Sequence, residues 1–238
     1  MTDWFEEWFG EEYLQLYPHR DETDAASVVA LLRDTLPWQA GWRVLDVGCG
    51  AGRHSVALEA AGARPIGLDL STRLLSRARE VTGAPLVRAD MRALPVRDGT
   101  MDLTVNLFTS FGYFQDDETH RAALQGMVRT VRPGGWFAID FLNALQVRRD
   151  LVAVDELPLG DKVATVTRQV TDDGRFVRKT IRTPDGREFL ERVRLFEPEE
   201  LQAMVTGAGI ELKATFGNYD GTPLSPGARR TILMGTRS

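Results

Sequence analysis

The chain has 238 residues, enough for one large α/β domain with an insertion or at most two small domains. Its net charge is −5 and no long run of lysine or arginine occurs, so neither a nucleic-acid partner nor a membrane partner is expected. No apolar run approaches the roughly 18 residues that a membrane span requires. The acidic N-terminus does not resemble a signal peptide, and the single cysteine, Cys49, excludes an internal disulfide. These features favour a cytoplasmic protein.

The first 36 residues predict a helical segment. Residues 3–17 place aromatic side chains at a spacing typical of one or two short amphipathic helices, which either dock on a core or close over a pocket. Residues 24–36 have a continuous apolar face, and Pro37 ends that helix. We therefore expect residues 1–36 to form an N-terminal leader or cap.

The most informative stretch is residues 44–55, V-L-D-V-G-C-G-A-G-R-H-S. It predicts a strand, a glycine turn and a helix, and the three alternating glycines allow a ligand to lie against bare backbone. The dinucleotide fingerprint G-x-G-x-x-G fails in both registers, because Arg53 and Ser55 stand where its third glycine would be. A tight turn without a ligand is the structural alternative.

Strands and helices then alternate, which predicts a parallel sheet with helices on both faces. Further strands are expected at residues 64–69, 85–89, 101–107, 136–141, 210–216 and 231–235. In such sheets ligands bind at the carboxyl ends of the strands, where Asp46, Asp69, Asp90 and Asn106 stand. Asp69 follows Gly50 by 19 positions, where a carboxylate can accept hydrogen bonds from ribose hydroxyls, and Asp90–Met91 suits an adenine.

Residues 160–196 carry hairpin signals instead, with alternating segments separated by D-D-G and T-P-D-G turns. They predict an antiparallel meander inserted after strand five. We expect a core formed by residues 37–145 and 197–238, and an insert at residues 146–196 that serves as a lid or a homodimer surface.

The D-x-G-x-G-x-G loop, the acid after strand two and the R-P-G-G before strand five resemble the class I S-adenosylmethionine-dependent methyltransferases. Within that superfamily the chain resembles the small-molecule branch that includes glycine and amino-sugar N-methyltransferases. The resemblance implies a Rossmann-like, seven-stranded, mostly parallel sheet with an antiparallel insert. It also implies in-line methyl transfer to a nitrogen or oxygen of a small-molecule acceptor, with S-adenosylhomocysteine as the product.

The resemblance also assigns site residues by motif position. Cofactor contacts are expected from Tyr17, Arg20, Asp46, Gly48, Cys49, Gly50, Asp69, Leu70, Asp90, Met91, Asn106 and Leu107. Asn106 and Leu107 would lie beside the sulfonium, and Tyr17 and Arg20 would reach the methionine end.

Tyr113 and His54 are the catalytic candidates, since methyl transfer needs mainly alignment and at most one general base. Amino-sugar enzymes tend to have histidine where this chain has Tyr113. Arg20, Arg229 and Arg230 could bind an anionic acceptor, and no metal is expected. The alternatives are a protein or peptide side-chain methyltransferase and a nucleotide-cofactor binder or oxidoreductase.

Overall fold

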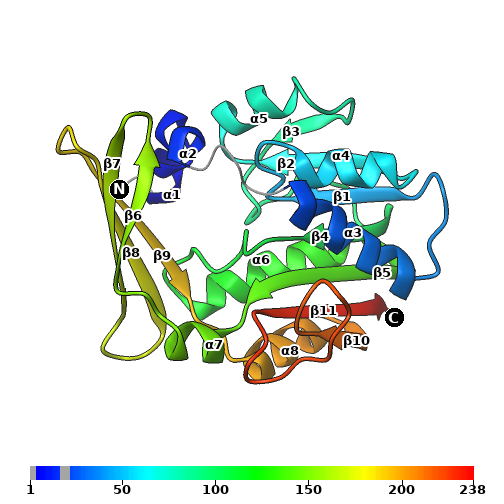
Figure 1. Cartoon of the computed structure of the whole chain (residues 1–238). Coiled ribbons are helices and arrows are strands. Elements are labelled where there is room, and N and C mark those ends of the chain that lie inside the picture. The colour runs from blue at the N-terminus through cyan, green and yellow to red at the C-terminus, as the bar shows by residue number, and fades with distance from the viewer. Residues whose placement is uncertain (1–3, 17–21) are drawn as a thin grey trace.

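The computed structural model describes residues 4–16 and 22–238 and contains a seven-stranded sheet (Figure 1). The glycine loop follows the carboxyl end of an interior strand of this sheet. The strand order is β10-β11-β5-β4-β1-β2-β3. The strands are β1 (Arg43–Val47), β2 (Arg64–Asp69), β3 (Leu86–Arg88), β4 (Met101–Asn106), β5 (Val131–Leu142), β10 (Ile210–Phe216) and β11 (Arg230–Arg237). Strand β11 runs antiparallel to its neighbours, β5 and β10, and the pairs among β5, β4, β1, β2 and β3 are parallel. The predicted Rossmann-like sheet is therefore confirmed.

Helices cover both faces of this sheet. They are α3 (Glu22–Thr35), α4 (Arg53–Ala60), α5 (Thr72–Ala78), α6 (Asp117–Thr130) and α8 (Pro198–Gly207). Successive residues of a strand point to opposite faces, and β1 shows the consequence. Val44 packs in an apolar cluster with α3 and α4, whereas Leu45 and Val47 belong to the cluster on the other face, with α6 and α8. The strands are thus buried on both sides, as their uninterrupted apolar runs require.

The insert is a separate four-stranded antiparallel sheet, β6 (Val154–Leu159), β7 (Lys162–Val170), β8 (Phe176–Arg182) and β9 (Glu188–Arg194), preceded by α7 (Ala144–Arg149). Strand β6 was not expected from the sequence, because it is an edge strand whose pattern is interrupted by Pro158. In Figure 1 this sheet stands beside the seven-stranded sheet, next to the N-terminal helices.

The N-terminal helices α1 (Trp4–Trp8) and α2 (Glu11–Leu16) pack against one face of the insert. The Trp8 indole Nε1 donates a hydrogen bond of 2.6 Å to Glu191 Oε1, and its ring centroid lies 4.9 Å from that of Phe189. Trp4 and Phe5 reach the other way, into the aromatic side chains of the segment after β4. The leader therefore bridges the insert and the core.

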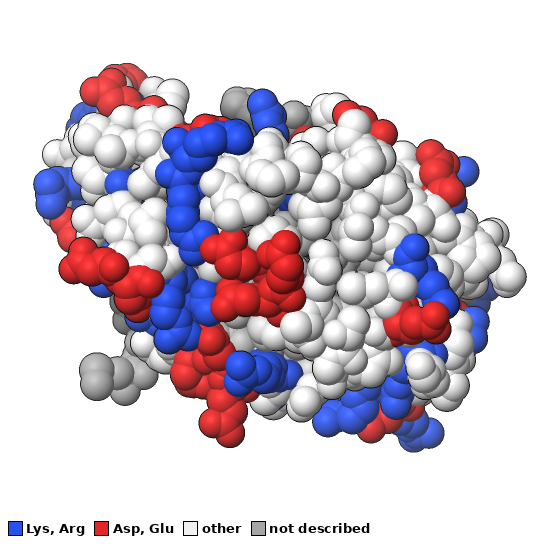
Figure 2. All heavy atoms as spheres, turned by 90° about the horizontal axis from the view of Figure 1, so that it is seen from below, with Lys and Arg blue, Asp and Glu red and all other residues white. Residues whose placement is uncertain are grey.

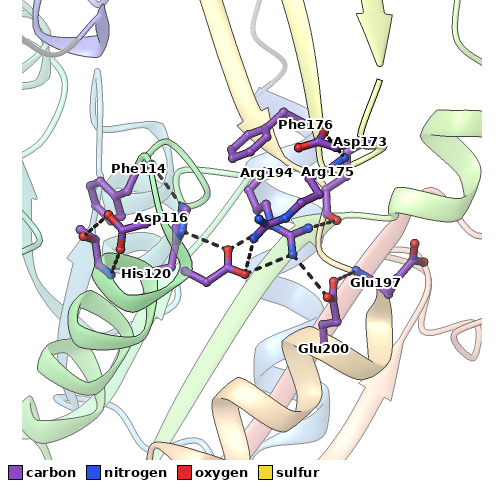
Figure 3. A network of polar contacts seen from close by, with 12 residues as sticks. Phe114, Asp116, His120, Asp173, Arg175, Phe176, Arg194, Glu197 and Glu200 are labelled. Carbon is purple, nitrogen blue, oxygen red and sulfur yellow. Dashed lines mark hydrogen bonds and ion pairs between the residues drawn. The ribbon is translucent and has the colours of Figure 1, made fainter. Parts of the chain in front are cut away.

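A buried arginine joins the insert to the core at the end of β9 (Figure 3). Arg194 makes ion pairs with Asp117 at the start of α6, at 3.1 Å, and with Glu200 in α8, at 3.3 Å. Its backbone N–H donates to the carbonyl of Gly112 at 2.8 Å.

Charges of both signs gather near the insert in Figure 2, where a basic band adjoins an acidic cluster. Among the described residues no helix has both the length and the apolar character needed to cross a membrane.

Candidate functional site

The three glycines after β1 all adopt the left-handed backbone conformation, with φ of +75° at Gly48, +56° at Gly50 and +87° at Gly52. At Gly48 and Gly52 the space beside the backbone is restrictive as well. A Cβ at Gly48 would lie 2.7 Å from the Cβ of Ser110, and one at Gly52 would lie 3.0 Å from the Cβ of Ala78. The loop is thus packed against the segment after β4 on one side and α5 on the other, and only glycine fits.

Asp69 ties the glycine loop to the end of β2. Its Oδ2 accepts a hydrogen bond from the Gly50 N–H at 2.9 Å, and its Oδ1 accepts one from the Ser71 N–H at 2.8 Å. Burial raises the pKa of this carboxyl, while the backbone hydrogen bonds from Ser71 and Gly50 lower it. A carboxylate has about four acceptor positions, so Asp69 can accept further hydrogen bonds while it shapes the loop.

A cavity of about 1310 Å³ opens at the carboxyl ends of the strands, beside this loop. It is lined by nine residues singled out from the sequence: Gly48, Cys49, Gly50, His54, Asp69, Leu70, Asp90, Met91 and Tyr113. Aromatic side chains from the leader and from the segment after β4 line another part: Phe5, Phe9, Tyr13, Phe108 and Phe114. Tyr17 and Arg20 lie outside the described residues.

Three of the expected cofactor residues are buried behind the loop and do not line this cavity. Asp46 Oδ2 accepts a hydrogen bond of 2.8 Å from the Ser55 hydroxyl, and Asn106 Nδ2 donates one of 2.9 Å to the Val47 carbonyl. Burial raises the pKa of Asp46 to about 6, and the nearby charge of Asp69 adds to the rise. The Oδ1 atoms of Asp46 and Asn106 are buried with no hydrogen-bond partner. Leu107 is fully enclosed.

The aromatic part of the cavity centres on Tyr113. Its ring centroid lies 5.3 Å from that of Trp4, 5.6 Å from Phe9 and 6.3 Å from Phe5. Its hydroxyl donates a hydrogen bond of 2.7 Å to the Thr109 carbonyl, which fixes the position of the phenolic oxygen.

His54 also lines the cavity, from the first turn of α4. Its Nε2 is buried with no hydrogen-bond partner. Burial, followed by the positive charges of Arg53 and Arg230, lowers the pKa of this imidazole to about 3. His54 is therefore neutral at pH 7 and a weak base.

His120 and Arg230 support the segment after β4. His120 in α6 accepts a hydrogen bond from the Phe114 N–H through Nε2, at 3.2 Å. Arg230 does not line the cavity, because its guanidinium donates to the Asp140 carboxylate at 2.7 Å instead of facing an anionic acceptor. Both partnerships join residues that no local motif connects.

Residues 44–135 match the family model described as a methyltransferase domain. A malonyl-[acyl-carrier protein] O-methyltransferase of Enterobacter lignolyticus is 30% identical over 178 residues, 71% of this chain and 68% of that protein. The chain is an S-adenosylmethionine-dependent methyltransferase. A cypemycin N-terminal methyltransferase of a Streptomyces species is 29% identical over 204 residues, 82% of each chain. The solved structure of S-adenosylmethionine-bound CalS10, an amino pentose methyltransferase from Micromonospora echinaspora, has a TM-score of 0.69 at 27% identity and covers 96% of this chain and 97% of its own.

The cavity of this methyltransferase fits the family's cofactor. The glycine loop presents backbone where a side chain would fill space, and Asp69 offers carboxylate lone pairs beside it. The unpartnered Oδ1 atoms of Asp46 and Asn106 lie behind the loop, outside the lining of the cavity. The expectation of an S-adenosylmethionine-dependent enzyme is therefore confirmed by the family.

Proposed function

We propose that the enzyme methylates an amino nitrogen or an oxygen of a small-molecule acceptor inside the cavity at the carboxyl ends of the strands. The observation that carries this proposal is the composition of that cavity. One part is formed by the glycine loop and Asp69, and the other by aromatic side chains of α1, α2 and the segment after β4. Helices α1 and α2 line the cavity and also pack against the insert, an arrangement that suits an enclosed acceptor.

We assign the cofactor to the polar part. The Gly48 and Gly50 backbone would lie against its methionine moiety, Asp69 would accept from the ribose hydroxyls, and Asp90 and Met91 would flank the adenine. Asp90 already pairs with Arg92 at 2.6 Å, so its carboxylate is held in place at the cavity wall. Cys49 and Leu70 complete the wall. Asp46, Asn106 and Leu107 would act from behind the loop, and Tyr17 and Arg20 keep their proposed roles at the methionine end.

When bound, S-adenosylmethionine supplies a methyl group whose leaving group is a neutral thioether. The chain then has to align the acceptor, exclude water and take up a proton where the acceptor carries one. We assign the alignment to Tyr113, whose hydroxyl is fixed by Thr109 and whose ring packs on the leader. His54 is neutral and buried, so its unpartnered Nε2 can accept a hydrogen bond from a bound group.

A screen of acceptor classes tests the proposal. The purified enzyme is incubated with S-adenosylmethionine and panels of amines, phenols and carboxylic acids, and release of S-adenosylhomocysteine is measured. We expect turnover with one small-molecule class and its loss in the Tyr113→Phe variant. Absence of turnover with every small molecule would contradict the proposed acceptor class.

A second acceptor class is favoured by one comparison. The cypemycin N-terminal methyltransferase matches most of this chain, and its name describes modification of an N-terminus. Short peptides with a free α-amino group therefore belong in the same screen. Turnover with peptides but not with free amines would favour this second function.

We further propose a cytoplasmic location, supported by the single cysteine, and a homodimer formed through the insert. The outward face of the insert exposes Val154, Val163 and Leu190 to solvent, which suits contact with a second copy. Analytical ultracentrifugation of the wild type and of a Val163→Lys variant tests this assembly, and a monomeric wild type would contradict it.

A further inference from the structure

The segment that follows β4 begins with an unusual turn. Phe108 and Thr109 have φ of +56° and +62°, the only residues other than glycine in the described chain with left-handed backbone. A β-branched residue such as Thr109 rarely adopts this conformation. Two successive residues other than glycine keep it only when their surroundings impose it. The turn lies beside the cavity, since Phe108 and Ser110 line it.

A cluster of the buried Asp140 with the half-buried Tyr219 and Arg230 imposes this conformation. The Asp140 carboxylate accepts three hydrogen bonds, from the Phe108 N–H at 2.9 Å, the Tyr219 hydroxyl at 2.7 Å and the Arg230 Nε at 2.7 Å. The Asp140 carbonyl accepts from the Thr109 N–H at 3.0 Å. Arg230 also donates to the Thr109 hydroxyl at 3.1 Å. Both left-handed residues are thus bound by the same cluster.

The turn at Phe108 and Thr109 also supports the glycine loop. The Ser110 hydroxyl lies 3.2 Å from the Gly48 carbonyl oxygen and 2.9 Å from that of Leu107. The Arg53 guanidinium, at the start of α4, lies 4.0 Å from the centroid of the Phe108 ring. A change in the turn would therefore be transmitted to both ends of the cofactor loop.

We propose that Asp140, Tyr219 and Arg230 are positioning residues for cofactor binding, although none of the three lines the cavity. They hold Phe108 and Thr109 in the left-handed conformation, and that turn holds the glycine loop in its binding shape. This proposal rests on the proposed placement of the cofactor at the glycine loop. If the cluster is loosened, only a fraction of molecules keeps the competent loop, and the apparent affinity is the intrinsic affinity multiplied by that fraction.

The test uses Tyr219→Phe, which removes one hydrogen bond to Asp140 and keeps the ion pair with Arg230. Binding of S-adenosylhomocysteine is measured by calorimetry, and amide hydrogen exchange is measured across residues 107–114. We expect about three- to tenfold weaker binding and faster exchange in residues 107–114, with exchange in β1 and β4 unchanged. Thr222→Val is the matched control, because Thr222 bonds to Asp220 in the same loop without reaching Asp140.

A rescue variant separates positioning from general loosening. Thr109→Gly adopts positive φ without steric cost, so Tyr219→Phe/Thr109→Gly should regain most of the lost affinity. Thr109→Val, which removes the Arg230 contact and keeps the β-branched side chain, provides a second way to loosen the turn if Tyr219→Phe does not fold. Wild-type affinity and exchange in both loosened variants would overturn the proposal, as would a loss that Thr109→Gly does not reduce. If wild-type enzyme does not bind S-adenosylhomocysteine at all, the proposed cofactor placement fails instead.

Discussion

The imidazole of His120 accepts a hydrogen bond from the backbone N–H of Phe114, across 3.2 Å in a fully buried site. Because Nε2 is the acceptor, this ring must be neutral with its proton on Nδ1. Burial lowers the pKa of His120 to about 4, although Asp117 nearby acts in the opposite direction. The aromatic wall of the cavity thus depends on an uncharged histidine.

Acid should therefore weaken this part of the fold. The pKa of His120 is near 6.5 unfolded and about 4 folded, so the stabilisation is complete above pH 6.5 and is lost as the pH falls toward 4. His120→Gln keeps an acceptor but cannot be charged, and we expect it to be less stable than wild type at pH 7.5. The difference in unfolding free energy between the two proteins should decrease by about 1–3 kcal/mol by pH 4.5. Urea unfolding at a series of pH values measures this difference. If the unfolding free energies of the two proteins change equally with pH, the lowered pKa of His120 is contradicted.

Asp46 gives the opposite pH dependence. Its pKa is raised from 3.8 to about 6 by burial, so ionisation costs stability as the pH rises from about 4 to 6. Asp46→Asn keeps an acceptor for Ser55, and its stability relative to wild type should increase across that window by about 2–3 kcal/mol. Its affinity for S-adenosylhomocysteine should fall, because the buried Oδ1 acceptor is lost. A stability difference that does not vary between pH 4 and 7 would contradict the raised pKa.

Arg194 should stabilise the junction between the insert and the core. Arg194→Met removes a nearly buried guanidinium from Asp117 and Glu200, and Asp117 keeps Arg175 as a partner at 2.6 Å. We expect a loss of about 2–4 kcal/mol in unfolding free energy, measured by urea denaturation. Arg182→Met, which removes an exposed ion pair with Glu188, is the control and should cost less than about 1 kcal/mol. Equal losses in the two variants would contradict the role given to Arg194.

Tyr113→Phe removes a single oxygen from the acceptor side of the cavity. If that oxygen orients the acceptor or receives its proton, kcat should fall by roughly 10²-fold, with affinity for S-adenosylhomocysteine within about twofold of wild type. Steady-state kinetics with the acceptor found in the screen, together with calorimetry, check this result. Unchanged turnover at saturating acceptor would remove Tyr113 from the mechanism.

The sheet could be predicted because its signals are local. Each apolar run and the glycine loop consist of a few consecutive residues, and Asp69 directly ends the apolar run of β2. Two local errors also have physical causes. Strand β6 was missed because it is an exposed edge strand containing Pro158, and β5 begins at Val131 because it accommodates R-P-G-G with a register shift between Met101 and Leu103.

The supports of the site could not be predicted, because they pair residues far apart in the chain. Asp140 and Arg230 are 90 positions apart, and Arg194 and Asp117 are 77 apart. Nor does a strand-end position tell whether a side chain faces the ligand. Asp69 reaches the cavity, whereas Asp46 and Asn106, predicted by the same rule, lie behind the loop.

The central claim is that the cofactor binds at the glycine loop with Asp69 beside it. Calorimetric titration of S-adenosylhomocysteine into wild type and Asp69→Ala tests this claim most directly. We expect wild type to bind and the variant to bind more weakly by about 1.5–3 kcal/mol, because charge-assisted hydrogen bonds to the ligand and the hold on the Gly50 N–H are lost together. Equal affinity in the two proteins, or binding of NAD with none of S-adenosylhomocysteine, would contradict the account.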